Sequence, residues 1–185
     1  MEDENKEVVT APDSFGVVVE VMRSIKDLLE YKNSKYGNAA LKPVHIFYKG
    51  NATDSICIRL DDKLNRLYNS TEIRLNDIAD VAGYLVLLLI SKGAYEDKGE
   101  FSDKVSCVLN NTYATIKSMG MPCSSIGVFS KVQVDPWLTE ADKCIRAVLN
   151  EQSMDNIITL AQRLLGAIIL YMAENGMTDL SQFKD

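Results

Sequence analysis

The sequence predicts an all-α fold built from two related copies of one helical unit. Three observations lead to this prediction: apolar residues recur at helical spacing over long stretches, proline and glycine are scarce, and short motifs of the first half reappear in the second. The 185 residues include only 4 prolines and 10 glycines, which favours long helices over a many-turned β protein. We expect a helical bundle in which the two units pack as a pseudo-twofold pair.

The first unit is expected to follow a flexible, polar N-terminal segment over residues 1–14. Apolar residues at helical spacing predict a first helix over 15–32. A loop is expected over 33–43, where a glycine and a proline interrupt the pattern. Residues 41–60 are rich in β-branched and aromatic side chains, so a short extended segment is an alternative there.

Two further helices complete the predicted first unit. One is expected over 54–69, with Asp54 as its N-cap. The other is expected over 76–92, with Asn76 as its N-cap and Gly93 as its stop.

The evidence for a repeat is a set of motifs that recur in the same order at offsets of 80 to 83 residues. The pairs are Phe47-Tyr-Lys49 with Phe129-Ser-Lys131, Asp62-Lys63-x-x-Arg66 with Asp142-Lys143-x-x-Arg146, Gly83 with Gly166, and Gly93 with Gly176. A helix over 101–117 is the candidate partner of the first helix. We therefore expect a first unit over 15–93 and a degenerate second unit over 94–185 that packs on it.

Charge and composition narrow the classes of function. A formal net charge of −6 disfavours binding to DNA or RNA, although a divalent cation could bridge small phosphorylated ligands to carboxylates. The four scattered cysteines suit a reducing cytosol. The acidic start does not have the pattern of a signal peptide, and the apolar runs over 81–90 and 164–173 are too short to span a bilayer. We expect a cytoplasmic protein that does not act at a membrane.

An acidic cluster in the first unit is the feature most suggestive of chemistry. Asp61 and Asp62 lie on the second predicted helix, and Asp77 and Asp80 lie three residues apart on the third, followed one turn later by Tyr84. If the two helices are antiparallel, the four carboxylates can converge. A Mg²⁺ ion would relieve their repulsion and dock phosphate oxygens.

The second copy lacks most of this cluster. At the repeat offsets, the positions of Asp61, Asp77 and Asp80 hold Ala141, Leu160 and Arg163. A structural role for the acids is the alternative, because an acid in the first turn favours the helix dipole. Asp62 could also pair with Arg66 or Arg59, and Asp80 with a lysine elsewhere. The recurrence of that last pair as Asp142 and Arg146 favours a structural pair at those positions.

Several motifs carry a resemblance to a known family. They are Lys32-Asn-Ser-Lys-Tyr-Gly-Asn-Ala-Ala-Leu-Lys-Pro43, Ile46-Phe47, Ile58-Arg-Leu-Asp-Asp-Lys-Leu-Asn-Arg66 and Asp77-Ile-Ala-Asp-Val-Ala-Gly-Tyr-Leu85. In this order they resemble the nucleotide-modification-associated domain family common in phages, which itself resembles the all-α MazG-type nucleoside triphosphate pyrophosphatases. If the chain is phage-encoded, the expected location is the host cytoplasm.

The resemblance implies a set of site residues. Asp61, Asp62, Asp77 and Asp80 would bind Mg²⁺ and act in catalysis, although MazG-type enzymes typically use glutamates with a longer first motif. The expected contacts to a nucleotide are Lys32, Lys35, Tyr36, Asn38, Lys63, Arg66 and Tyr84.

Three functions are compatible with these features. The first is a Mg²⁺-dependent nucleoside triphosphate pyrophosphatase of (deoxy)nucleotide metabolism. The second is a protein that binds and sequesters a nucleotide or a nucleotide-derived signal without turnover. The third is a helical interaction scaffold, and homo-oligomerisation is left open in all three.

Overall fold

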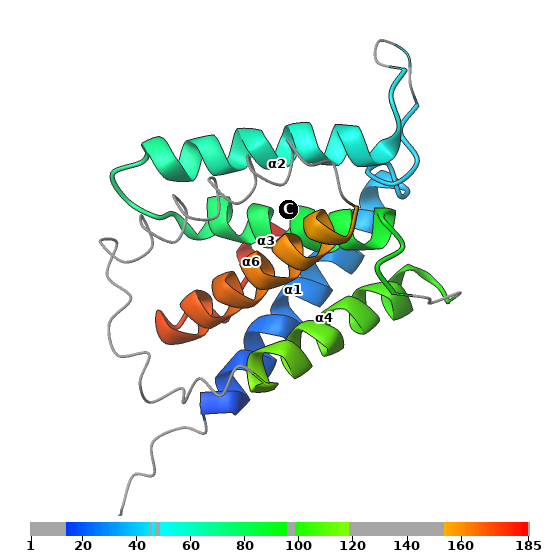
Figure 1. Ribbon diagram of the computed structural model, residues 1–185. Coiled ribbons are helices and arrows are strands. Elements are labelled where there is room, and N and C mark those ends of the chain that lie inside the picture. The colour runs from blue at the N-terminus through cyan, green and yellow to red at the C-terminus, as the bar shows by residue number, and fades with distance from the viewer. Residues whose placement is uncertain (1–13, 45, 47–48, 96–98, 119–153, 185) are drawn as a thin grey trace, which may run out of the picture.

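The computed structural model describes residues 14–44, 46, 49–95, 99–118 and 154–184, and its regular secondary structure there is entirely helical (Figure 1). The predicted all-α class is therefore confirmed for this part of the chain. The repeat motifs at 129–131 and 142–146 lie outside the described residues. The helices are α1 (Ser14–Tyr36), α2 (Ala52–Asn69), α3 (Leu75–Ser91), α4 (Phe101–Ser118), α6 (Met154–Glu174) and the short 3₁₀ helix η1 (Ser181–Phe183).

Helix α3 lies at the centre of the bundle. It contacts α1, α2, α4 and α6, and ten of its residues are buried (Figure 1). A helix that is apolar around most of its circumference is stable only when other helices cover it, which is the arrangement seen here. The polar side chains that α3 contributes to the pocket described below therefore come from a helix that is packed on several sides.

The first helix is longer than the sequence predicted. It continues to Tyr36, so Lys32 is a helical residue followed by one more turn. Gly37 and Asn38 then adopt positive φ angles of 58° and 62°, which end the helix and turn the chain. No strand occurs in the described residues between 41 and 60.

Both predicted N-caps were wrong, because each helix begins earlier than the sequence predicted. Helix α2 begins at Ala52, and its cap is Asn51, whose side-chain oxygen accepts a hydrogen bond from the backbone N–H of Asp54 at 2.8 Å. Helix α3 begins at Leu75 after Arg74 and has no side-chain cap. The predicted stop at Gly93 is confirmed by its positive φ of 62°.

Helices α3 and α6 each have a glycine at the contact with a neighbouring helix, where a Cβ atom would make an ordinary van der Waals contact. A Cβ atom on Gly83 would lie 3.4 Å from Leu29 on α1, and one on Gly166 would lie 3.5 Å from Ile116 on α4. Each of the two helices is also followed by a glycine with positive φ, Gly93 at 62° and Gly176 at 65°. Each of the two helices thus has a glycine facing another helix and a glycine in the turn that follows it.

The stretch over 157–174 of α6 is long and apolar enough to cross a membrane by length and composition alone, and half of it is buried inside the protein. Its buried residues include Leu165, Ile169 and Met172, all with no exposed surface. The helix contacts α1, α3 and α4. In this structure its buried apolar side chains therefore pack in the hydrophobic core.

Candidate functional site

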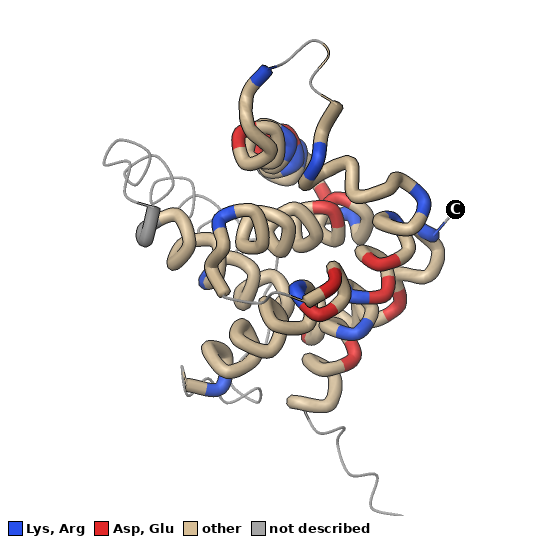
Figure 2. The backbone as a smooth tube through the Cα atoms, turned by 90° about the vertical axis from the view of Figure 1, so that its right-hand side faces the viewer, with Lys and Arg blue, Asp and Glu red and all other residues tan. Residues whose placement is uncertain are grey.

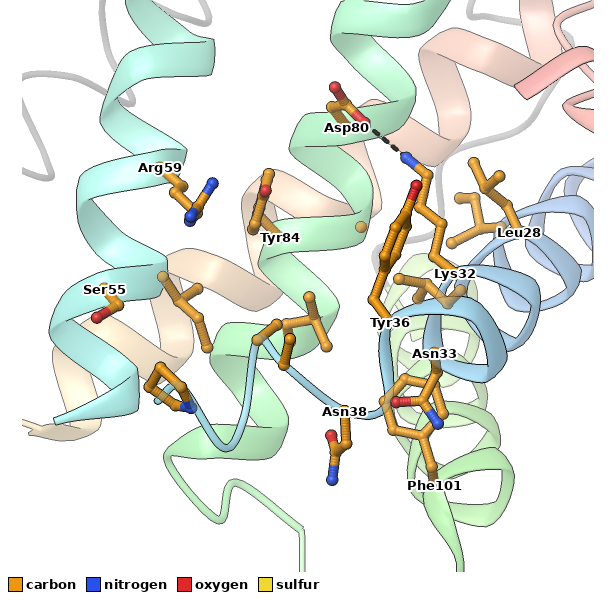
Figure 3. Close-up of a pocket in the computed structure, with 18 of the residues that line it drawn as sticks. Leu28, Lys32, Asn33, Tyr36, Asn38, Ser55, Arg59, Asp80, Tyr84 and Phe101 are labelled. Carbon is orange, nitrogen blue, oxygen red and sulfur yellow. Dashed lines mark hydrogen bonds and ion pairs between the residues drawn. The ribbon is translucent and has the colours of Figure 1, made fainter. Parts of the chain in front are cut away.

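A pocket of about 590 Å³ opens between α1, α2 and α3 (Figure 3). Its volume lies within the range of roughly 300–1,000 Å³ that is usual for small-molecule sites. Apolar side chains of the three helices form its base, and the loop after α1 closes one side. Five of the predicted nucleotide contacts or acids line it: Lys32, Tyr36, Asn38, Asp80 and Tyr84.

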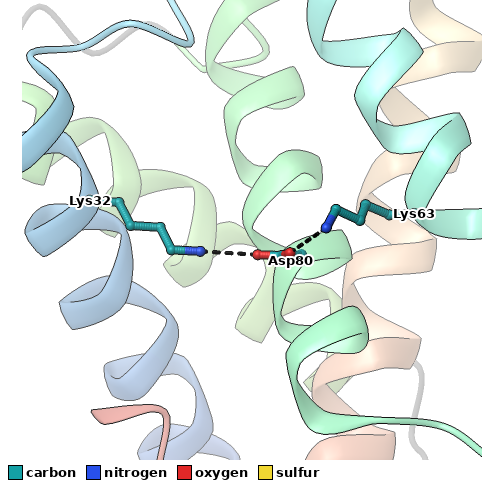
Figure 4. Close-up of polar contacts among 3 residues, drawn as sticks. All are labelled: Lys32, Lys63 and Asp80. Carbon is teal, nitrogen blue, oxygen red and sulfur yellow. Dashed lines mark hydrogen bonds and ion pairs between the residues drawn. The ribbon is translucent and has the colours of Figure 1, made fainter. Parts of the chain in front are cut away.

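Asp80 of α3 is held between two lysines at the edge of this pocket (Figure 4). One carboxylate oxygen accepts a hydrogen bond from Lys32 Nζ at 3.0 Å, and the other accepts one from Lys63 Nζ at 2.7 Å. Partial burial alone would raise the pKa of Asp80, but the hydrogen bonds from Lys63 and Lys32 outweigh burial and lower it. The carboxylate is therefore ionised at neutral pH, and the three side chains together carry one positive charge.

Three basic residues share one side of helix α2, where Asp62 lies beside them. Arg59, Lys63 and Arg66 follow one another at spacings of four and three residues, which places them on one side of the helix. Asp54 and Asp61 are seven residues apart and lie on the opposite side. Figure 2 shows α2 nearly end-on, with its basic and acidic positions turned in different directions. The buried residues Ile56, Leu60 and Leu67 face the core, and Lys63, at the border between this apolar side and the basic side, reaches Asp80 on α3.

Arg59 is the cationic residue of α2 that lines the pocket. Its guanidinium has no ion-pair partner in the part of the chain that the structure describes. In Figure 3 it stands beyond Tyr84, on the opposite side of the pocket from Lys32. An unpaired guanidinium at the wall of a pocket is well suited to bind a phosphate or carboxylate group.

Ring and amide side chains supply the other contacts. Tyr36 from the end of α1 and Tyr84 from α3 stand apart on the two sides of the pocket (Figure 3). The side-chain oxygen of Asn38 is buried and lacks a hydrogen-bond donor among the described residues. Such an acceptor is costly to leave unpaired, and a donor on a bound ligand would satisfy it.

The four predicted metal ligands do not meet in one place. Asp61 lies two residues, or about 200°, from Lys63 around α2, so it points away from Asp80. Asp61 and Asp62 are exposed, whereas Asp77 is 8% exposed in the first turn of α3. Across the described ranges, no three His, Cys, Asp or Glu side chains are grouped as a metal site. Mg²⁺ binding stays a prediction.

Three other predicted contacts lie outside the pocket lining. Lys63 is ion-paired with Asp80, and Arg66 lies on the same side of α2 as Arg59. Lys35 lies over the ring of Tyr31, with its Nζ 5.4 Å from the ring centroid. The pocket lining also includes three polar residues that the sequence did not predict as ligand contacts, namely Asn33, Ser55 and Arg59. The spacing Ser55–Arg59–Lys63, one helical turn between neighbours, could have pointed to them as a single polar face.

Comparisons with protein-family models, with curated proteins and with solved structures found no match for the chain.

Proposed function

We propose that the chain binds a nucleotide in the pocket between α1, α2 and α3 and holds it with its own cationic and aromatic side chains. The observation that carries the proposal is the meeting of Lys32 and Arg59 with Tyr36 and Tyr84 around one cavity. A nucleotide offers the matching groups, since its phosphate is anionic and its base has a flat π face and polar edges.

The state of Asp80 favours capture of a nucleotide by cationic side chains over capture through a metal ion. A metal ligated by Asp80 would compete with two lysines that already contact both carboxylate oxygens. A phosphate meets no such obstacle, because the Lys32–Asp80–Lys63 group has a net positive charge. Binding without turnover, the sequestering function, is thus the function that this geometry supports best.

Isothermal titration with the standard ribo- and deoxyribonucleoside mono- and triphosphates, in EDTA, tests the proposal. We expect binding that does not need a divalent cation. Arg59→Gln should weaken it about tenfold, the effect of losing one charge-assisted contact. Arg66→Gln is the matched control, because Arg66 lies on the same side of α2 but does not line the pocket. Absence of binding across the whole panel would refute the proposal.

A second candidate is the Mg²⁺-dependent nucleoside triphosphate pyrophosphatase, which is favoured by the position of Asp80 at the pocket wall beside Lys32. Pyrophosphate release from the same triphosphates, measured with Mg²⁺ and with EDTA, separates the two functions. Metal-dependent release that disappears in Asp80→Asn would establish the enzyme. Tight binding with no release under either condition would establish sequestration.

We also propose that residues 94–185 are a degenerate second copy of the first unit. The supporting observations are that Gly83 and Gly166 each face a neighbouring helix and that Gly93 and Gly176 each end the helix with a positive φ. The repeat then predicts that residues 142–146 belong to a helix related to α2. Backbone chemical shifts measured by NMR test this, and non-helical shifts over that segment would contradict it.

A further inference from the structure

A second cavity, of about 310 Å³, adjoins the first pocket. Leu28, Lys32, Ala79 and Asp80 line both cavities. Because Lys32 and Asp80 are ion-paired at 3.0 Å, this pair forms part of the boundary between the two spaces. A group bound to the ammonium of Lys32 would therefore have one cavity on each side of it.

The far wall of the second cavity combines a ring with an amide. Phe183 comes from η1, and Asn76 comes from the first turn of α3. An aromatic face next to a hydrogen-bonding amide can bind a nucleobase by stacking and by contact with a polar edge.

The segment that carries Phe183 is fixed to the bundle. Leu180 is 1% exposed and belongs to the hydrophobic core. The hydroxyl of Ser24 on α1 donates a hydrogen bond to the carbonyl oxygen of Thr178, and the N–H of Phe183 donates one to the carbonyl of Leu180 at 3.1 Å. The ring is thus placed before any ligand arrives, which lowers the entropic penalty of binding.

We infer that the preferred ligand has two ring-bearing halves joined through phosphate, as in a dinucleotide. Its phosphate contacts Lys32 at the boundary, one base enters the first pocket with Tyr36 and Tyr84, and the other base stacks on Phe183. This inference rests on the proposed nucleotide binding and extends it from a mononucleotide to a ligand that spans both cavities.

The test is titration in EDTA with 5′-phosphorylated homodinucleotides of each base, in ribo and deoxy forms, and with the matching nucleoside monophosphates. The dinucleotide of the preferred base should bind about tenfold more tightly than its mononucleotide, which is the effect of one additional stacked base. Phe183→Leu should remove most of this difference and leave mononucleotide affinity unchanged. The matched control is Gln182→Ala, an exposed neighbour in the same turn that does not line the cavity.

Phe183→Leu is chosen because it keeps an apolar side chain at the end of η1 and removes only the ring, and Phe183→Ala serves as a second variant. Equal affinities for mono- and dinucleotides, or an equal loss of both in Phe183→Leu, would overturn the inference while leaving the proposed function in place. If neither class of ligand binds, the proposed function and the inference both fail.

Discussion

Replacing Asp80 by asparagine should destabilise the protein, because it removes the negative charge between two lysines that the structure places on either side of it. The carboxylate accepts hydrogen bonds at 3.0 and 2.7 Å, and a hydrogen bond to a charged group contributes about 1.5–3 kcal/mol. Solvent screening reduces these values, since the Lys32 side chain is 38% exposed and the Lys63 side chain 19%, and exposed pairs contribute only about 0–1 kcal/mol. We expect a net loss of about 1–3 kcal/mol.

The pH dependence of this loss follows from the lowered pKa of Asp80. The folded-state pKa lies below the ordinary value of 3.8, so the stabilisation is present above that value and is lost as the pH falls through the folded-state pKa. The difference between wild type and Asp80→Asn should accordingly be constant near neutral pH and shrink in acid.

Urea unfolding at neutral pH and at a series of acidic pH values measures both effects. Asp62→Asn is the matched control, because Asp62 is an exposed acid in the same predicted cluster, and its stability should stay within about 0.5 kcal/mol of wild type. If Asp80→Asn were as stable as Asp62→Asn at neutral pH, the account of Asp80 as an ion-paired residue would be refuted.

Three further substitutions test the packing and the pocket. Leu165→Ala should lower the free energy of unfolding by about 2–5 kcal/mol, because Leu165 is fully buried and its truncation leaves a cavity. A loss below about 1 kcal/mol in urea unfolding would contradict the burial of Leu165 in the core. Gly83→Ala should raise the free energy of unfolding by up to about 1 kcal/mol, because alanine favours the helix and its Cβ would contact Leu29 at 3.4 Å. The same Cβ would narrow the pocket and weaken nucleotide binding. If stability and nucleotide affinity changed in the same direction, the placement of Gly83 in the pocket lining would be contradicted. Burial raises the pKa of Glu174 from its ordinary 4.5 to about 7, so the folded protein loses stability as the pH rises through that interval. Glu174→Gln should remove this loss, and its melting temperature should exceed that of wild type at alkaline pH. If the melting temperatures of the two proteins changed in parallel with pH, the raised pKa of Glu174 would be refuted.

The helices were predictable from the sequence because the spacing of apolar residues within each segment indicates a helix without reference to the rest of the chain. The apolar stretch that forms α3 and the spacing that forms α4 gave element positions within one or two residues. The caps were less predictable, because both Asn51 and Asp54 are suitable residues and the choice depends on where the first turn packs. In the structure α2 starts at Ala52 and Asn51 is the cap. The backbone N–H of Asp54 donates a hydrogen bond to the side-chain oxygen of Asn51, whereas the sequence predicted the Asp54 side chain as the capping acceptor.

The candidate site was predictable only in part, because its contacts join distant segments. The sequence selected Asp80 and Lys32, but their pairing spans 48 residues and depends on how α1 and α3 pack. It also grouped Asp61 with Asp80, although the burial of Ile56, Leu60 and Leu67 sets the rotation of α2 and turns Asp61 away. Phe183, more than a hundred residues from Asp80, could not have been placed at the same cavity from spacing alone.

The most direct test of cation-mediated nucleotide binding is a titration of Asp80→Asn with the nucleotide that wild type binds best, in EDTA and in Mg²⁺. If the ligand is held by lysine and arginine, the substitution removes a negative charge near the phosphate and releases two ammonium groups. Affinity should then rise about threefold or more, with or without the metal ion. If wild type binds only with Mg²⁺ and Asp80→Asn abolishes that binding, then Asp80 is a metal ligand and cation-mediated binding is contradicted.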